Sequence, residues 1–313
     1  MGTAFVFPGQ GSQAPGMGQE VLDAFPVARH VLEEVDEALK QNLSKLIAEG
    51  PAEELTLTEN AQPALMAVSM AILQVLQTEA GIDLARSCTF VAGHSLGEYT
   101  ALVAALALDL AEGARLLKTR GRAMQVAVPV GTGAMAALIG ADLEIAREIA
   151  DAAAAGEVCQ LANDNAPGQV VLSGSKDAVD RAIEIAPDHG IKRAIPLPVS
   201  APFHCQMMQP AADVMEEALA EAALSSPLVP LVANVTAEAV EDPDAIRALL
   251  VEQVTAMVRW RECVEFMRDA GTDTVVEIGA GKVLSGLTRR IDRDLRAFSV
   301  STPSEIDELV KSL

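Results

Sequence analysis

Hydrophobic and polar positions change their spacing several times along the chain, and each spacing predicts one kind of element. Strands that are covered on both faces read as continuous apolar segments. Such segments occur at 4–7, 89–92, 231–234 and 274–278. Apolar residues three or four positions apart predict helices instead. This spacing covers 25–40, 60–79, 100–110, 110–126, 207–222 and 246–253. Strands that alternate with helices indicate an α/β domain with a mostly parallel sheet.

The pattern between positions 132 and 197 is different, because two strands follow each other without a helix between them. The expected order is strand 134–139, helix 143–154, strand 158–162, strand 169–173, helix 176–185 and strand 192–197. This β-α-β-β-α-β order is that of the ferredoxin-like unit. We therefore expect a main domain made of 1–126 and 199–313, and an inserted ferredoxin-like subdomain at 127–198.

The segment from Gly93 to Gly97 reads G-x-S-x-G and lies between an expected strand and an expected helix. In that context the motif forms a nucleophile elbow, with Ser95 at its tip and the helix N-terminus beneath it. The two glycines are needed because strand and helix approach closely there. An elbow predicts a hydrolase-like α/β main domain. The same pattern also fits a serine that only caps a helix at a tight turn.

Composition narrows the function classes. Hydrophobic residues make up 50% of the chain and charged residues 21%, which is typical of a globular protein. The net charge of −21 argues against a nucleic-acid partner, because phosphate binding requires a basic surface. The four cysteines show no metal-ligand spacing, so we expect free thiols and no metal site. The longest apolar run, 101–108, is too short to span a membrane. We expect a cytoplasmic protein without membrane contact.

A serine nucleophile needs a base within hydrogen-bonding reach, and the chain has four histidines. His30 lies on an amphipathic helix and His189 at a helix end. His94 is adjacent to Ser95, and neighbours on a sharp turn project in different directions. His204 remains, in a loop where the chain re-enters the main domain. We expect His204 to be the base; a structural loop histidine is the alternative.

Two further observations restrict the chemistry. An α/β-hydrolase places an Asp or Glu between serine and histidine in the sequence, but the acidic residues here lie on helices or in the inserted unit. This argues against an ordinary hydrolase.

The loop at 9–14 matches the G-x-G-x-x-A dinucleotide motif, although Pro15 and Gly16 delay the helix that should begin there. We expect this loop to approach a substrate, with Gln10 supplying polar groups.

Several motifs occur together along nearly the whole chain. They are Phe7-Pro8-Gly9-Gln10-Gly11-Ser12-Gln13, Gly93-His94-Ser95-Leu96-Gly97-Glu98-Tyr99, Arg120-Gly121, Ala201-Pro202-Phe203-His204 and Glu277-Ile278-Gly279. The combination closely resembles the malonyl-CoA:acyl-carrier-protein transacylases of bacterial fatty-acid synthesis and the acyltransferase domains of polyketide synthases.

The resemblance implies a role for each matching position. Ser95 would be the nucleophile and His204 its base. The backbone N–H groups of Gln10 and Leu96 would form the oxyanion hole. Arg120 would hold the free malonyl carboxylate as a bidentate partner. The resemblance assigns the remaining positions as follows: the main-chain carbonyl of Gln253 orients the histidine, and His94, Asn163 and Phe203 line the cleft.

The implied reaction is transfer of a malonyl group from malonyl-CoA to the phosphopantetheine thiol of acyl carrier protein, by a ping-pong mechanism. No cofactor is implied, and a monomer is expected. The alternatives are a serine thioesterase or esterase, and a non-catalytic module that binds acyl-CoA or carrier protein. Carrier proteins are acidic, as this chain is, so a local basic patch must recruit them. The candidates are Lys192, Arg193, Lys282, Arg289 and Arg290.

Overall fold

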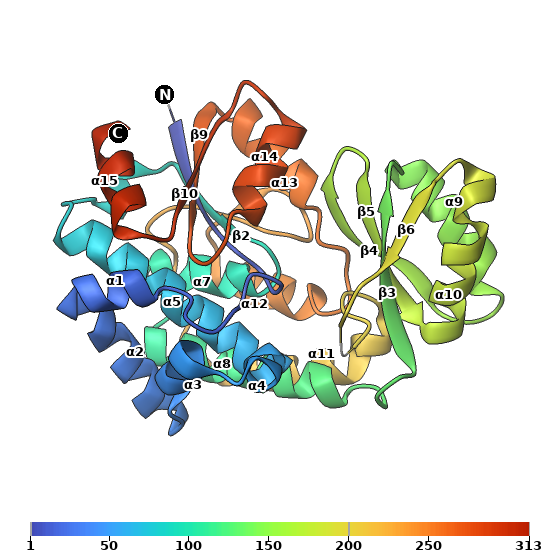
Figure 1. Ribbon diagram of the computed structural model, residues 1–313, viewed down its shortest axis with the longest axis horizontal. Coiled ribbons are helices and arrows are strands. Elements are labelled where there is room, and N and C mark those ends of the chain that lie inside the picture. The colour runs from blue at the N-terminus through green and yellow to red at the C-terminus, as the bar shows by residue number, and fades with distance from the viewer. Residues whose placement is uncertain (1, 200, 313) are drawn as a thin grey trace.

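A computed structural model describes residues 2–199 and 201–312 (Figure 1). Its larger sheet has six strands in the order β10-β9-β1-β2-β7-β8. They are β1 (Gly2–Phe7), β2 (Phe90–Gly93), β7 (Leu231–Val232), β8 (Ala239–Val240), β9 (Thr272–Ile278) and β10 (Arg296–Val300). Neighbouring strands are parallel except for β7 and β8, which are antiparallel. The expected mixed α/β fold with a mostly parallel central sheet is confirmed.

Helices cover both faces of this sheet (Figure 1). They are α1 (Gln19–Ala24), α2 (Pro26–Leu39), α3 (Leu43–Glu49), α4 (Ala52–Thr56), α5 (Thr58–Thr78), α6 (Leu84–Ser87), α7 (Leu96–Ala104), α8 (Leu110–Val126), η2 (Gln206–Met208), α11 (Gln209–Glu221), α12 (Pro243–Glu252), α13 (Trp260–Asp269), α14 (Val283–Ile291) and α15 (Pro303–Ser312). The pattern predicted the long helices to within a few residues. It assigned no element to α13, α14, β10 or α15.

The first strand shows why the sheet is covered on both sides. Successive side chains of a strand point to opposite faces. Phe5 and Phe7 belong to the core shared with α2, α5 and α8, whereas Ala4 and Val6 belong to the core shared with α13 and α14. All four residues are fully buried, so the strand reads as one continuous apolar run.

One helix among the described residues, α5, is long and apolar enough to cross a membrane by length and composition alone. However, 78% of its most apolar window is buried inside the protein. Leu65, Ile72 and Leu76 of α5 lie in the main core, where α5 packs against α2 and α8. Its apolar character is therefore accounted for by packing within the fold.

The second sheet is antiparallel, with the order β4-β5-β3-β6. Its elements are β3 (Gly133–Ile139), α9 (Leu143–Ala154), β4 (Cys159–Ala166), β5 (Gln169–Ser175), α10 (Lys176–Ile185), η1 (Ala186–His189) and β6 (Arg193–Pro196). Leu138, Ile149 and Leu172 contribute to a separate core between this sheet and its helices. Figure 1 shows these elements together at one end of the molecule.

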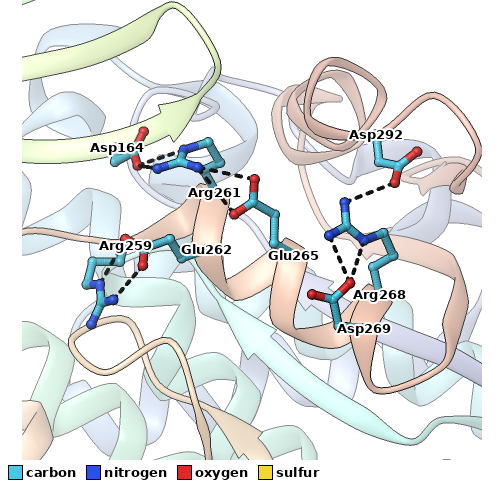
Figure 2. Close-up of polar contacts among 8 residues, drawn as sticks. All are labelled: Asp164, Arg259, Arg261, Glu262, Glu265, Arg268, Asp269 and Asp292. Carbon is cyan, nitrogen blue, oxygen red and sulfur yellow. Dashed lines mark hydrogen bonds and ion pairs between the residues drawn. The ribbon is translucent and has the colours of Figure 1, made fainter. Parts of the chain in front are cut away.

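The two sheets are joined through the segment that precedes α13. The N–H of Val258 donates to the carbonyl of Ala162 on β4, and the N–H of Asp164 donates to the carbonyl of Val258, each at 2.9 Å. Asp164 also accepts from the guanidinium of Arg261 at 2.8 Å, and Arg261 pairs with Glu265 as well (Figure 2). Backbone hydrogen bonds and a half-buried ion pair thus fix β4 against α13.

Candidate active site

The segment from β2 to α7 forms a tight elbow around Ser95. A Cβ atom on Gly93 would lie 1.9 Å from the carbonyl carbon of Gly97, and one on Gly97 would lie 2.3 Å from the carbonyl oxygen of Phe7. No side chain fits at either position. Ser95 itself has a φ of 54° and a ψ of −109°, a positive-φ conformation that costs a non-glycine residue about 1 kcal/mol or more. Its hydroxyl makes no capping bond to α7, unlike a serine with a purely structural role at this place.

A fully buried asparagine bridges the two sides of the elbow. The side-chain oxygen of Asn234 accepts from the N–H of Ser95 at 2.8 Å, and its side-chain nitrogen donates to the carbonyl of Gly93 at 2.7 Å. Asn234 follows β7, which ends at Val232 and not at 234 as expected. The strand ends there because the backbone turns, with the N–H of Ala237 donating to the carbonyl of Ala233 at 2.9 Å. Nothing in the sequence pattern distinguishes this asparagine from an ordinary turn residue.

His204 lies within reach of the serine. Its Nε2 is 2.8 Å from the hydroxyl oxygen of Ser95, and its Nδ1 is 2.9 Å from the carbonyl oxygen of Gln253. A carbonyl can only accept, so Nδ1 carries the proton and Nε2 of the neutral ring accepts from the hydroxyl. Of the four histidines, the structure thus brings the expected one to Ser95.

The partner of Nδ1 lies at the end of a helix. Gln253 directly follows α12, and the last carbonyls of a helix have no partner within it. They also carry the partial negative charge of the helix dipole. A helix-terminal carbonyl can therefore orient the imidazole where a hydrolase uses a carboxylate. This arrangement accounts for the lack of a plausible third acidic residue in the sequence.

The surroundings of His204 keep it neutral. Its pKa is lowered to about 3, first by burial and next by the positive charge of Arg120. Only 4% of the residue is exposed. A neutral imidazole is the state required of a general base, and His204 is in that state at physiological pH.

Arg120 of α8 lies beside both residues and is 1% exposed. One terminal nitrogen donates to the side-chain oxygen of Gln62 at 2.8 Å. The other donates to the side-chain oxygen of Gln253 at 2.8 Å and to the hydroxyl of Ser95 at 3.1 Å. Its Nε is buried without a partner. Among the residues that the structure describes, no carboxylate pairs with this guanidinium, so its charge is available to an anionic ligand.

A cavity of about 470 Å³ opens over these groups and is lined by residues from both sheets and the helices that cover them. The main sheet and its helices contribute Gln10, Ser95, Leu96, Arg120, Phe203 and His204, and the antiparallel sheet contributes Asn163, Asn165 and Val171. Leu96 is the first residue of α7, and Gln10 lies in the loop after β1. The structure thus brings every expected site residue to one cavity or, for Gln253, into contact with its lining.

Other polar residues at the site were not expected from the sequence. The side chain of Asn165 lies 2.8 Å from Nε2 of His94 and fixes that ring against the cavity wall. Gln62 and Asn234 hold Arg120 and the elbow, respectively. Asn165 lies on β4, Gln62 on α5 and Asn234 in a turn, and no spacing rule marks any of these single amides. In the part of the chain that the structure describes, no cluster of His, Cys, Asp or Glu could hold a metal ion. The four cysteines are free and buried.

Comparisons with known proteins agree with this geometry. Residues 4–298 match the family described as acyl transferase domain. The malonyl CoA-acyl carrier protein transacylase of Bacillus subtilis (strain 168) is 45% identical over 311 residues, which is 99% of this chain and 96% of the relative. An acyl-carrier-protein S-malonyltransferase structure from Bartonella henselae is 53% identical, with a TM-score of 0.97 over 100% of this chain and 99% of that one.

A further similar structure contains a malonyl-transacylase in complex with a type II PKS acyl-carrier protein. It is 42% identical and superimposes with a TM-score of 0.97 over 100% of both chains. Both the sequence match and the structural match extend over nearly the whole chain. The chain therefore belongs to the acyl transferase domain family, among the malonyl CoA-acyl carrier protein transacylases.

Proposed function

We propose that this chain transfers a malonyl group from malonyl-CoA to the phosphopantetheine thiol of acyl carrier protein. The observation that carries the proposal is the position of Arg120, a buried guanidinium 3.1 Å from the hydroxyl of Ser95 that has no carboxylate partner within 2–199 and 201–312. Malonate is only three carbons long. A malonyl ester on Ser95 would therefore place its free carboxylate within reach of this guanidinium.

The first half-reaction begins at the Ser95 hydroxyl. Nε2 of His204 takes its proton while Oγ attacks the thioester carbonyl of malonyl-CoA. The negative charge on the carbonyl oxygen is stabilised by the backbone N–H groups of Gln10 and Leu96; one such donor contributes about 3 kcal/mol to lowering the barrier. The C–S bond then breaks, and the imidazolium returns its proton to the coenzyme A thiolate. A malonyl-serine ester remains.

The second half-reaction runs the same steps with another thiol. His204 accepts the proton of the carrier's pantetheine thiol, whose sulfur attacks the ester carbonyl. The C–O bond breaks and Ser95 Oγ recovers the proton. Because His204 is oriented by the carbonyl of Gln253, its Nδ1 proton stays in place during both steps. Both the cavity and the base are thus used twice.

We also propose how the chain is divided into domains. We assign 1–126 and 199–313 to a hydrolase-like main domain that supplies Ser95, His204 and Arg120. We assign 127–198 to a ferredoxin-like subdomain, supported by its β-α-β-β-α-β order and antiparallel sheet. This subdomain forms the opposite wall of the cavity with Asn163.

The enzyme would act as a cytoplasmic monomer without a cofactor, a metal, a nucleic-acid partner or a membrane partner.

Mass spectrometry of the intact protein tests the reaction directly. Incubation with malonyl-CoA should add one malonyl mass, and addition of holo carrier protein should remove it. Ser95→Ala should form no adduct and lower transfer at least about 10³-fold, since the remaining groups cannot replace the nucleophile. Rapid release of coenzyme A without carrier would favour a thioesterase instead. Absence of an adduct on the unmodified enzyme would favour a binding module.

We propose that the acidic acyl carrier protein docks on α14 and on the edge of the antiparallel sheet. Leu284 and Leu287 of α14 line the cavity, and Arg290 donates to Gln169 across its rim at 2.9 Å. Lys192 and Arg193 are exposed at the start of β6, the edge strand of the antiparallel sheet. The other two candidates are already engaged within the chain: Lys282 pairs with Glu305, and Arg289 donates to the carbonyl of Ala297.

Charge reversal tests this surface. Lys192→Glu combined with Arg290→Glu should raise the KM for carrier protein about tenfold and weaken its salt dependence, since rim charges act mainly on encounter. Lys45→Glu is the matched control, because Lys45 is an exposed lysine on α3, away from the cavity lining. An unchanged KM in the double variant would exclude these residues as the docking surface.

A further inference from the structure

Glu98 is the one carboxylate of the elbow motif, and the mechanism above gives it no task. It lies in the first turn of α7, three residues after Ser95, and is 1% exposed. Its Oε2 accepts from the side-chain nitrogen of Gln253 at 2.8 Å and from the N–H of Asn234 at 3.1 Å. Among the described residues, no basic side chain forms an ion pair with it. A buried carboxylate that is held only by amide groups is costly, which indicates a role in the site.

Two acceptors fix which way the Gln253 amide points: its side-chain nitrogen donates to Glu98 at 2.8 Å and to the backbone carbonyl of Ser95 at 3.0 Å. A backbone carbonyl and an ionised carboxylate both only accept hydrogen bonds, so the NH₂ group of Gln253 must face them. The carbonyl end of the same amide then faces Arg120, where it accepts at 2.8 Å. The opposite orientation would place two acceptors against each other and an NH₂ group against a guanidinium.

This arrangement gives Arg120 a neutral acceptor in place of a carboxylate. Gln62 supplies a second neutral acceptor on the other terminal nitrogen. The guanidinium is therefore oriented by two amides while its full charge stays available to the substrate. Glu98 still contributes negative charge nearby, but Gln253 separates it from Arg120. A carboxylate in direct contact with Arg120 would compete with malonate for the same nitrogen atoms.

We propose that Glu98 is a positioning residue that sets acyl specificity: through the side chain of Gln253, it holds Arg120 oriented and free of any carboxylate partner. Glu98 does not touch the acyl group. The inference rests on the proposed malonyl transfer. It assigns the side chain of Gln253 to Arg120 and leaves the backbone carbonyl of Gln253 to His204.

A double-mutant cycle with two acyl donors tests the proposal. Glu98→Met removes the charged one of the two acceptors that fix the Gln253 amide, and kcat/KM for malonyl-CoA should fall about 30-fold, as expected for a lost hydrogen bond to a charged group. The fall should lie mainly in KM. Transfer of the neutral acetyl group, and labelling of Ser95 by a fluorophosphonate, should change less than about threefold. A purely structural role would reduce all three alike.

Gln253→Ala completes the cycle, because it removes the side chain but keeps the backbone carbonyl that orients His204. It should cause the same loss of malonyl selectivity, and adding Glu98→Met to it should cost no more than about another twofold. Additive losses in the double variant would overturn the proposal. Glu98→Gln is the conservative control: one carbonyl oxygen can still accept both bonds, so malonyl selectivity should stay within about fivefold of the unmodified enzyme.

The exchange variant, which combines Glu98→Gln with Gln253→Glu, tests the proposal independently if Glu98→Met does not fold. It conserves composition and net charge but moves the carboxylate into contact with Arg120. Malonyl preference over acetyl should fall at least about 100-fold, because an internal ion pair then competes with the substrate. Retained preference would overturn the inference. An unmodified enzyme that does not prefer malonyl would remove the proposed function itself.

Discussion

Two arginines of this chain lie in contrasting surroundings. Arg261, at the joint between the two sheets, donates to the carboxylates of Asp164 and Glu265 (Figure 2). Within the part of the chain that the structure describes, Arg120, at the floor of the cavity, donates only to glutamine oxygens and to Ser95. Both are fixed by several hydrogen bonds, but only Arg261 has its charge neutralised by direct contact.

The difference shows how the fold separates two uses of positive charge. An arginine that holds two sheets together is best paired with a carboxylate, because a buried carboxylate without a cation would destabilise the fold. An arginine that must recognise a carboxylate is best held by neutral acceptors, which fix its orientation without occupying its charge. Three predictions test this contrast.

The largest effect is expected at the cavity arginine. Arg120→Ala should lower kcat/KM for malonyl-CoA about 10³-fold, because a desolvated charge pair with the substrate is lost. Acetyl and other neutral acyl groups should gain relative to malonyl. Arg120→Lys should recover little, since an ammonium cannot bind a carboxylate through two parallel N–H groups. Steady-state kinetics with both donors checks this; unchanged malonyl preference in Arg120→Ala would refute the assignment.

The second prediction concerns the stability cost of Glu98. Burial raises its pKa from 4.5 to about 7, against the opposing effects of Gln253, Asn234 and Arg120. The folded protein therefore binds a proton that the unfolded chain releases, and stability from this group declines as pH rises from 4.5 to 7. Glu98→Gln removes this loss.

The gain in unfolding free energy for Glu98→Gln should thus be small at pH 5 and reach about 3 kcal/mol at pH 8. Denaturant unfolding at the two pH values measures it. Equal effects at pH 5 and pH 8 would show that the carboxylate is not held at a raised pKa. Tyr99 and Cys263 are coupled to Glu98, but burial raises the pKa of both groups, so neither titrates between pH 5 and pH 8. Arg120 remains charged throughout this range.

The smallest effect is expected at the joint. Arg261→Met leaves Asp164 buried without its cation and should cost about 2 kcal/mol of unfolding free energy at pH 8, a value reduced because Arg261 is partly exposed. Burial already raises the pKa of Asp164, and Arg261 opposes that rise. The loss should shrink at pH 5, where the isolated carboxyl can take up a proton.

Lys176→Met is the matched control for this variant. Lys176 pairs with Asp180 on an exposed face of α10, and surface pairs of this kind contribute well under 1 kcal/mol. An equal cost for both variants would mean that the joint does not depend on its buried ion pair. Malonyl transfer by Arg261→Met at low temperature should remain close to normal, because Arg261 does not line the substrate cavity.

The sequence predicted those parts of the fold that depend on local pattern. The continuous apolar run at 4–7 predicted a strand covered on both faces, and the two glycines around Ser95 predicted the elbow. His204 followed from elimination among four histidines. The structure places the strand and the elbow as predicted and brings His204 to Ser95, since each of these predictions relied on residues close in sequence or on a rare residue type. Helix α13 was not assigned, although its buried positions, such as Trp260 and Val264, have helical spacing.

The remaining features depend on contacts between distant segments. Ser95 and Asn234 are 139 positions apart, and Glu98 and Gln253 are 155 apart. A backbone carbonyl leaves no mark in the sequence, so only the resemblance to known transacylases pointed to Gln253. The neutral surroundings of Arg120 were not visible either, because three segments that are far apart in the chain provide them.

Gln253 has a consequence for attempts to change the acyl group that this enzyme accepts. Its backbone carbonyl orients the base, and its side chain orients the arginine. Alterations near Gln253 will therefore change turnover and selectivity together. Gln62 lies on the other side of Arg120, contacts Met124 and makes no hydrogen bond to His204. An engineer who wants a larger or uncharged acyl group should therefore begin at Gln62 and Met124, which line the cavity and, among the described residues, make no hydrogen bond to Ser95 or His204.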